Sequence, residues 1–375
     1  MISVRKLDTH SRADVNAFVD FPYRLYRDHP MWVPPPKLDM RSYLKKDKHP
    51  FFEHSDGDFF VAEQDGRVVG RVVALENRRY NDYHDKRQAQ FYFFDSEDDQ
   101  KIAEALFGRV FEWARERDLN QVIGPKGMGP LDGYGMLVEG FEHRQTMTMM
   151  NYNYPYYPEM MEALGFRKAV DFVSHYAHIS EFRMPERVHR IAERVQERKS
   201  LRVFNPKNKR QLRAWKDRLG RTYNQSFIEN WEYYPLTDNE IEYVIDTVIT
   251  FADPRYIKLI IHEDDVVGFL LAFPDVSAAL QRAKGRLFPF AIIDLFLEMR
   301  RTDWVAINGA GILPDYQGRG GNALLYSEME KTLRGSGFEH ADFTQVAESA
   351  VQMRRDLENL GGKAYKNHRV FIIDL

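Results

Sequence analysis

Apolar and polar residues form the same strand pattern twice along the chain. Residues 59–75 and 259–273 each read as an apolar run, a short turn with acidic residues or glycine, Val-Val-Gly and a second apolar run. Apolar runs bounded by turn residues predict β-hairpins. The glycines of the two Val-Val-Gly triplets, Gly70 and Gly268, are 198 positions apart. The pattern therefore predicts one hairpin in each half of the chain.

A second pair of similar segments lies farther along each half. Leu164-Gly165 precedes an apolar strand-like run, and Leu360-Gly361 does the same 196 positions later. Both segments indicate a helix that ends at a glycine and a strand that follows it. Because two unrelated motifs share almost one offset, we interpret the chain as a tandem duplication.

The repeats predict the domain organisation. We expect one domain over residues 1–180, a linker helix over 181–200 and a second domain over 201–375. In the linker, Val188, Ile191, Ala192 and Val195 lie on one helical face. The order of strands and helices in each half indicates an α/β (α+β) fold, a mixed β-sheet flanked by helices.

Composition narrows the class of protein. A chain of 375 residues is longer than a domain with a single hydrophobic core usually is. Its composition, 43% hydrophobic and 29% charged residues, is typical of a folded protein. The net charge of −3 argues against a nucleic-acid partner, and the absence of cysteine excludes disulfides and thiolate ligands. The twelve histidines show no ligand spacing, so no metal is expected. Without a signal-peptide pattern or a run of ~20 apolar residues, we expect a cytoplasmic protein.

The segment with the most chemical information is 304–338. An apolar strand ends at Leu313-Pro314, and a glycine-rich loop, 317–322, precedes a helix whose apolar face is Leu325, Met329 and Leu333. Small residues let backbone N–H groups approach a phosphate, the helix start favours negative charge, and Arg319 adds a cation. The loop lacks the Lys-Ser/Thr of a P-loop and the three-glycine spacing of a dinucleotide fold. It predicts a phosphate site, with an ordinary glycine turn as the alternative.

The loop Gln317-Gly318-Arg319-Gly320-Gly321-Asn322 resembles the Gln/Arg-x-x-Gly-x-Gly/Ala motif of the GNAT superfamily of acyl-CoA acyltransferases. The resemblance extends to 313–316 and to Leu360-Gly361, and both halves follow the element order of that family. It implies an acetyl-CoA or acyl-CoA co-substrate, held by the backbone of Gly311, Ile312 and Leu313 and by Gln317, Gly318, Arg319, Gly320, Gly321 and Asn322. Two positions depart from the family pattern, Asn322 at the final Gly/Ala place and Leu357 where many members carry the tyrosine that protonates the thiolate.

The equivalent loop is missing from the first half. After the strand 91–94, the chain runs into Asp95-Ser96-Glu97-Asp98-Asp99 before a helix over 102–115. Four acids suit a helix start but repel a polyphosphate. We therefore expect one working site, in the second half, with the first half serving as a structural or substrate-binding domain.

The resemblance implies transfer of an acyl group to an amine. Glu348 is a candidate base, with a helix-start carboxylate as the equal alternative, and Asn308 is a candidate for orienting substrate. Tyr365 is a candidate proton donor, with a plain strand aromatic as the alternative. Four tyrosines are expected to form either an aromatic wall for the substrate or an ordinary tyrosine-rich domain interface: Tyr152, Tyr154, Tyr156 and Tyr157.

An insertion distinguishes the second half. Gly268 to Val305 spans 37 positions, against 22 from Gly70 to Tyr92. Within it, residues 282–301 combine a basic entry with a Phe/Ile/Leu-rich run, which fits a membrane surface, a pocket roof or a helix packed on its own sheet. Some tandem proteins of this type are thought to acylate long-chain amines, so a lipid-like amine is one acceptor class that the resemblance implies.

Two other functions remain open from the sequence. A non-catalytic acyl-CoA-binding or regulatory protein would fit Leu357 at the acid position. A Fem-like aminoacyl transferase would need a basic groove for tRNA, which the near-neutral charge disfavours. The oligomeric state does not follow from the residues.

Overall fold

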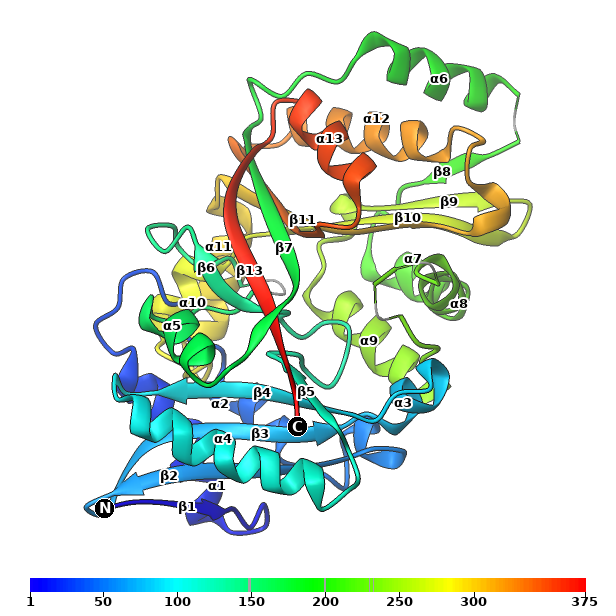
Figure 1. Ribbon diagram of the computed structural model, residues 1–375. Helices are drawn as coiled ribbons and strands as arrows, with labels where there is room; N and C mark the ends of the chain where they lie inside the picture. Colours follow the sequence, from blue (N-terminus) through cyan, green and yellow to red (C-terminus); the bar gives the residue numbers. More distant parts are fainter. Residues whose placement is uncertain (148–149, 199, 229, 232) are drawn as a thin grey trace. The chain divides into compact units, whose positions relative to one another are not determined.

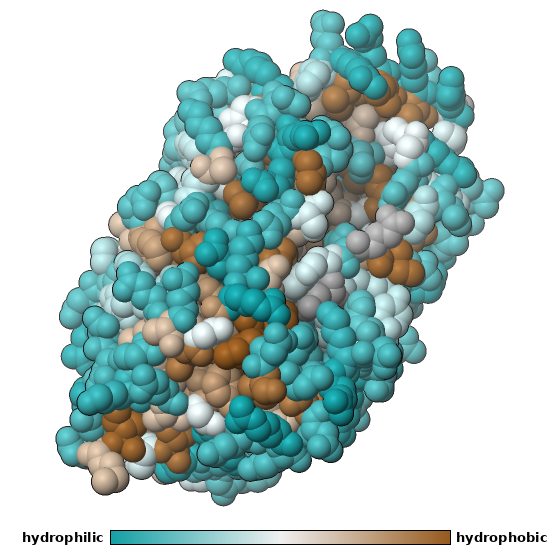
Figure 2. Space-filling model, in the orientation of Figure 1, coloured by the Kyte–Doolittle hydropathy of each residue, from teal (hydrophilic) through white to brown (hydrophobic). Residues whose placement is uncertain are grey.

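The computed structural model describes residues 1–147, 150–198, 200–228, 230–231 and 233–375 (Figure 1). The chain forms two compact units. The first unit comprises 1–173, 276–297 and 365–375, and the second comprises 174–275 and 298–364. Hydrophilic residues cover most of the face drawn in Figure 2, with hydrophobic residues in smaller patches among them. Across the described residues, no helix combines the length and apolarity that crossing a membrane requires.

The first unit contains most of the elements of the N-terminal half, an inserted helix pair and the last strand of the chain. Its strands are β1 (Ile2–Lys6), β2 (Asp56–Gln64), β3 (Arg67–Glu76), β4 (Gln88–Ser96), β5 (Gln121–Gly124), β6 (Met136–Glu139), the start of β7 (Arg167–His178) and nearly all of β13 (Lys363–Asp374). Its helices are α1 (Arg12–Leu25), α2 (Lys37–Tyr43), η1 (Pro50–Glu53), α3 (Arg78–His84), α4 (Gln100–Arg115), α5 (Tyr156–Ala163), α10 (Ser277–Ala283) and most of α11 (Ala291–Arg301).

The sheet of the first unit is buried on both faces. Its strands follow the order β1-β2-β3-β4-β5-β13, and β6 pairs with β13. Along β2, Phe60 packs in the core with α4, whereas its neighbours Phe59 and Val61 pack in the core with α1 and α2. Successive strand side chains point to opposite faces, so two buried faces require the continuous apolar run that the sequence carries.

The second unit contains the other elements. Its strands are β8 (Arg202–Phe204), β9 (Ile257–His262), β10 (Asp265–Pro274), β11 (Trp304–Ile312), β12 (His340–Ala347) and the end of β7. Its helices are α6 (Glu186–Glu197), α7 (Lys209–Arg213), α8 (Lys216–Ser226), α9 (Asp238–Phe251), η2 (Pro254–Tyr256), η3 (Pro314–Tyr316), α12 (Gly321–Arg334) and α13 (Val351–Asn359).

The sheet of the second unit runs in the order β12-β11-β10-β9-β8. The predicted apolar face of α12 is confirmed, because Leu325, Met329 and Leu333 are buried in one core with Ile260 and Ile312 of the sheet. The helix α6 packs on the same side, and α8 packs against β10 and β11. Helices therefore cover the strands that precede the glycine-rich loop.

The structure confirms both predicted repeats. Antiparallel β2–β3 and β9–β10 are the two hairpins. Gly165 and Gly361 each follow a helix directly and adopt positive φ values, 87° and 93°. Only glycine takes this conformation at no steric cost, so the repeated glycine ends α5 and α13 in the same way.

A third repeat appears only in the structure. β4 bulges beside β3 between the partners of Arg71 and Val73, and β11 bulges beside β10 between the partners of Leu270 and Ala272. A positive φ accompanies each bulge, 47° at Phe93 and 89° at Gly309. Phe93 lies three positions before Ser96, the partner of Gly70, and Gly309 lies three positions before Ile312, the partner of Gly268. Gly70 and Gly268 are the glycines of the two Val-Val-Gly triplets. Each bulge bends its strand away from regular pairing.

The two compact units do not follow the predicted ranges 1–180 and 201–375. Residues 365–375 belong to the first unit because β13 pairs antiparallel with β5 from Phe371–Gly124 to Asp374–Gln121. The expected linker helix, α6, is part of the second unit, where Ala192 and Val195 are buried beside α12. A helix that buries its apolar face in a core is a domain element.

The C-terminal strand leads to a stability prediction. Phe371 is 1% exposed in the core that contains α4. Phe371→Ala should destabilise the first unit by about 3–5 kcal/mol, the usual cost of removing a buried phenyl ring. Hydrogen exchange should report faster exchange in α4, with α12 unchanged. Phe338→Ala, in the core of the second unit, is the matched control and should affect α12 instead; the opposite pattern would contradict the composition of the units.

A second prediction concerns acid stability. Burial lowers the pKa of His368 on β13 to about 4, although its Nε2 lies 3.0 Å from the carbonyl oxygen of Asn151. Between pH 6.5 and 4 the unfolded chain binds a proton at this residue and the folded chain does not, so stability falls as the pH falls. We expect His368 to account for about 3 kcal/mol of this loss. Urea unfolding at pH 7 and pH 4.5 should show a shallower pH dependence for His368→Gln; identical slopes would contradict the prediction.

Candidate functional site

The glycine-rich loop connects β11 to α12 in the second unit. β11 ends at Ile312, the short helix η3 follows, and α12 begins at Gly321. Gly318 and Gly320 have φ values of 70° and 86°. These left-handed conformations favour glycine and let the chain turn directly from the strand into the helix.

The Gln317 N–H donates to the Pro314 carbonyl at 3.1 Å, whereas the backbone amides of residues 318–323 have no hydrogen-bond partner within the described part of the chain. The first hydrogen bond into α12 is that of the Leu324 N–H to the Gly320 carbonyl, and no side chain caps the helix. Six consecutive N–H groups, those of residues 318–323, are therefore available. Because unpaired amides at a helix start attract anions, the arrangement suits a diphosphate. The exposed Arg319 adds positive charge and lies over the Tyr316 ring at 5.1 Å.

β11 and β12 pair over only part of their length. Their parallel register runs from Trp304–His340 to Ile307–Phe343 and is not continued in the described residues. The Leu313 N–H donates to the Val267 carbonyl on β10 at 2.9 Å. Successive amides of a strand point to alternate sides, so the Ala310 and Ile312 amides point to the edge that faces away from β10. That edge can pair with an extended ligand as a further strand would.

An aromatic wall covers one face of β11 beside this edge. A Cβ atom at Gly311 would lie 2.7 Å from the Ser226 Cβ and 2.9 Å from the Phe269 ring. The Tyr223 ring stacks on Phe269 at 5.7 Å, and Phe227 meets it edge-on at 5.8 Å. Burial raises the pKa of the Tyr223 hydroxyl, which stays protonated. The wall is apolar, and glycine at 311 is what lets it approach the strand.

The outer side of the loop contacts α6. A Cβ atom at Gly320 would lie 2.7 Å from Val195 and 3.0 Å from Ile191. A Cβ atom at Gly318 would meet nothing within 4 Å. Any side chain at 320 would therefore force the Val195 and Ile191 side chains to shift, whereas 318 faces open space.

The predicted residues divide between the two units. Gly311, Ile312 and Leu313 and the loop 317–322 are contiguous in the second unit, as their sequence requires. Asn308 lies on β11 just beyond its last pair with β12, and the half-buried Glu348 follows the end of β12. Tyr365 belongs to the first unit, where its ring packs edge-on against His143 at 5.1 Å.

The four predicted substrate tyrosines lie in the first unit. Tyr154 stacks on Tyr26 at 4.9 Å and on Tyr156 at 5.4 Å. The Tyr156 and Tyr157 hydroxyls donate to the Ser96 carbonyl at 2.7 and 3.0 Å. Burial raises the pKa of Tyr152 to about 12. These hydroxyls remain protonated and bound to protein groups, so they build a rigid aromatic cluster.

Two of these tyrosines also line a cavity of about 110 Å³. Tyr152 and Tyr157 form part of its wall, together with residues 92–95 at the end of β4 and Pro125 after β5. The parallel pairing of β4 and β5 ends at Gln90–Ile123. The cavity therefore occupies the place in the first unit where these two strands part.

The first unit closes the start of its corresponding helix. The Asp99 side chain accepts a hydrogen bond from the Lys101 N–H and caps α4, in contrast to the uncapped α12. Asp95 does not face a phosphate position as the sequence suggested. It is buried, 2.7 Å from the Arg71 guanidinium and 3.1 Å from the Tyr26 hydroxyl.

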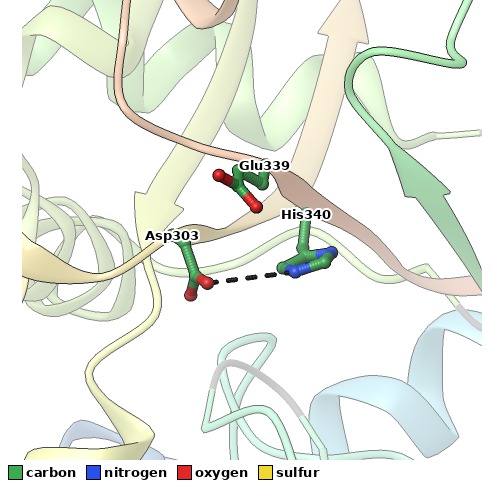
Figure 3. Close-up of side chains that lie close together, drawn as sticks. All are labelled: Asp303, Glu339 and His340. Atoms are coloured by element: carbon green, nitrogen blue, oxygen red, sulfur yellow. Dashed lines mark ion pairs between the residues drawn. The ribbon is translucent and has the colours of Figure 1, made fainter.

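A separate group of potential metal ligands lies at the other end of β11. Among the described residues, ligand atoms of Asp303, Glu339 and His340 lie within 4.8 Å of one another (Figure 3). The His340 Nε2 is 3.9 Å from Asp303, and its Nδ1 is 2.8 Å from the Tyr176 hydroxyl. The cluster is remote along the strand from the glycine-rich loop and is not part of that site.

Sequence reasoning missed the residues that surround the loop and strand. Ser226 and Phe269 were not singled out, and Val195 was assigned only to the linker helix, although all three come within 2.9 Å of the Cβ positions of Gly311 or Gly320. The available signal was Gly309-Ala310-Gly311 inside an apolar strand, because glycines there often mark a close approach of other groups.

The fold and the site together define the class. Each unit carries a hairpin, a bulged strand that parts from its parallel neighbour, and a helix after that strand. The chain has the fold of tandem GNAT proteins. The tandem GNAT protein from the clavulanic acid biosynthesis pathway, solved without AcCoA, superimposes with a TM-score of 0.57 over 100% of this chain and 98% of that chain, at 12% identity.

Two curated proteins are similar in sequence along nearly the whole chain. Protein YghO of Escherichia coli (strain K12) is 24% identical over 369 residues, which are 96% of this chain and 93% of that protein. Bacterial ceramide synthase of Caulobacter vibrioides (strain NA1000 / CB15N) is 25% identical over 368 residues, 96% of this chain and 94% of that protein. No family model matches the chain.

The loop geometry leads to a binding prediction. Gly318→Asp should weaken binding of CoA at least tenfold, because a carboxylate would stand among amides that suit an anion. Aspartate tolerates the left-handed conformation, and the space at 318 is open. Isothermal titration with CoA gives the measurement.

The matched control is Gly318→Asn, which has the same size and no charge. This variant should bind CoA with an affinity within about threefold of that of the parent chain, because its side chain has the size of aspartate but lacks the negative charge. Equal affinity of the Asp variant and the parent chain would mean that the loop does not hold the diphosphate.

Proposed function

We propose that the chain is an acyl-CoA-dependent N-acyltransferase with its cofactor site in the second unit. The observation that carries the proposal is the row of unbonded amides at 318–323, next to the open edge of β11. A helix start with free amides suits the diphosphate, and an open strand edge suits the amide-containing pantetheine arm.

The proposed contacts follow from the strand geometry. The diphosphate lies over the amides of Gly318 to Asn322, with Arg319 as the nearby cation. The pantetheine pairs with β11 at Ile312, and the Ala310 N–H points at the thioester carbonyl. Ala310 is favoured over Gly311 for this role, because the alternation of amides along β11 turns the Gly311 N–H toward β10. A fixed N–H donor stabilises the negative charge that develops on that oxygen.

The proposed reaction is attack of an amine on the thioester. The amine nitrogen forms a bond to the carbonyl carbon, the carbon–sulfur bond breaks, and CoA leaves as the thiolate. Glu348 takes the proton from the amine, and Asn308 orients the amine substrate. Tyr365 stays the sequence-based candidate for returning a proton to sulfur. Leu357 stands at the position where many GNAT proteins carry the tyrosine that protonates the thiolate. Its side chain is 6% exposed and is buried in the second unit.

For the acceptor we propose a long-chain amine. A ceramide is the amide of a long-chain amine and a fatty acid, and the relative named bacterial ceramide synthase matches 96% of this chain. The half-buried rings of Tyr223 and Phe227, which pack on the buried Phe269, place apolar groups beside β11 of the kind that a long alkyl chain needs. Tyr152, Tyr154, Tyr156 and Tyr157 remain proposed contacts for the acceptor.

A turnover assay tests the proposal. The full chain is incubated with palmitoyl-CoA or acetyl-CoA and either sphinganine or a short polar amine, and free thiol and N-acylated product are measured. We expect product with the long-chain amine, and at least tenfold less with Gly318→Asp, because the cofactor would bind poorly. Glu348→Gln should lower kcat at least tenfold with little change in KM, since proton removal contributes about 10²–10⁴-fold.

Each other outcome identifies a different function. Tight CoA binding without thiol release for any amine would indicate a non-catalytic acyl-CoA-binding protein. Product with short amines only would overturn the long-chain acceptor and keep acyl transfer. Absence of CoA binding would overturn the assignment itself.

A further inference from the structure

An exposed apolar surface surrounds the start of α11. Among its residues, Phe288, Phe290 and Phe296 are 65%, 79% and 60% exposed. Ile293 and Leu297 are 57% and 46% exposed. None of the eleven residues of α11 is buried. We call these five side chains the α11 apolar face.

The base of this segment is firmly attached to the first unit. The Gln281 side chain donates to the carbonyls of Pro30 and Trp32 at 2.7 and 3.0 Å, and the Gly285 carbonyl accepts from the Lys37 N–H at 2.9 Å. A Cβ atom at Gly285 would lie 2.3 Å from the Tyr23 ring, so the chain passes tightly against this unit. The exposed residues begin directly after an ordered anchor.

The helix needs a partner for its apolar side. Ile293, Phe296 and Leu297 follow the i, i+3, i+4 spacing that places them on one face. A helix of eleven residues is marginal in water unless its apolar face packs against something. Five large exposed apolar side chains in one short segment exceed what single surface residues explain.

Positive charge flanks the apolar face. Residues 282–301 contain five basic and two acidic residues, a net charge of +3, whereas the whole chain carries −3. Arg282 pairs with Asp294, and Arg301 pairs with Glu298. The remaining Lys284, Arg286 and Arg300 make no ion pair with any described residue. Their charge is therefore available to an external partner.

We propose that the α11 apolar face lies in the surface of an anionic lipid bilayer. Phenyl and aliphatic side chains enter the boundary between headgroups and acyl chains, while the flanking cations contact anionic headgroups. A second copy of this chain is a poorer partner, because its own face carries the same positive charge. The inference goes beyond acyl transfer, since surface binding is measured without turnover.

Vesicle co-sedimentation of the full chain tests the proposal. The vesicles consist of phosphatidylcholine alone or of phosphatidylcholine with about 30% phosphatidylglycerol, an anionic lipid that gives the vesicle a negative surface potential. We expect the parent chain to bind the anionic vesicles, and Phe288→Ser/Phe290→Ser/Phe296→Ser to bind at least tenfold more weakly. Because all three side chains are exposed, the variant should keep its circular dichroism and melting temperature.

Two further variants separate apolar and charge effects. Phe251→Ser, at a phenylalanine that is 53% exposed on another helix, is the matched control and should bind as the parent does. Arg286→Glu/Arg300→Glu changes the segment charge from +3 to −1 and should lower binding to anionic vesicles by about tenfold or more. Binding to neutral vesicles should change little.

Three results would overturn the proposal. One is the absence of binding by the parent chain to anionic vesicles. Another is equal binding by the parent and the triple serine variant. The third is a dimer of the parent chain that forms with rising concentration in light scattering, is lost in the triple serine variant and is accompanied by no vesicle binding. That result would assign the α11 apolar face to a second copy of the chain.

Discussion

Backbone amides without a partner among the described residues are the constraint that defines the candidate site of the second unit. One set lies where β11 separates from β12, and the other lies at 318–323 where α12 begins. Unpaired amides cost free energy when they are removed from water, and those of the loop remain accessible because residues 317–319 and 322 are exposed. The bulge at Gly309 and the left-handed glycines at 318 and 320 produce both sets within one short segment.

The two units share a fold but differ at the start of the helix that follows the bulged strand. Both units have the hairpin, the bulge and the helix after the bulged strand. In the first unit the Asp99 side chain caps α4 by accepting from the Lys101 N–H, and the buried Asp95 pairs with Arg71. The space that remains is an aromatic cavity of about 110 Å³ rather than a row of free amides. The same backbone frame therefore has a side-chain cap at the start of α4 in the first unit and no such cap at the start of α12 in the second unit.

Apolar surface is the second theme of the molecule. A phenylalanine and tyrosine wall approaches β11 only because position 311 lacks a side chain. A separate face on α11 remains exposed and is flanked by cations. An apolar substrate and a lipid surface make the same demand on a protein, which is to expose side chains that folding alone would bury. The proposed acceptor and the proposed membrane contact are physically compatible for this reason.

Local patterns determined much of the fold. Alternating and continuous apolar runs fixed the two hairpins, glycines fixed the ends of α5 and α13, and the 3.6-residue period fixed the buried face of α12. The loop 317–322 was also evident, because its chemistry is carried by neighbouring residues. These features depend on interactions over a few residues, which a sequence displays directly.

Only the tertiary structure decided the rest. β13 completes the first unit because its partner β5 lies about 250 residues earlier, and no local signal specifies a strand partner. The approach of Ser226, Phe269 and Val195 to the glycines of the site depends on packing between elements distant in sequence. Asp95 belongs to a buried ion pair because the fold supplies Arg71 beside it. Residue identity sets what each side chain can do, while long-range packing sets which groups it meets.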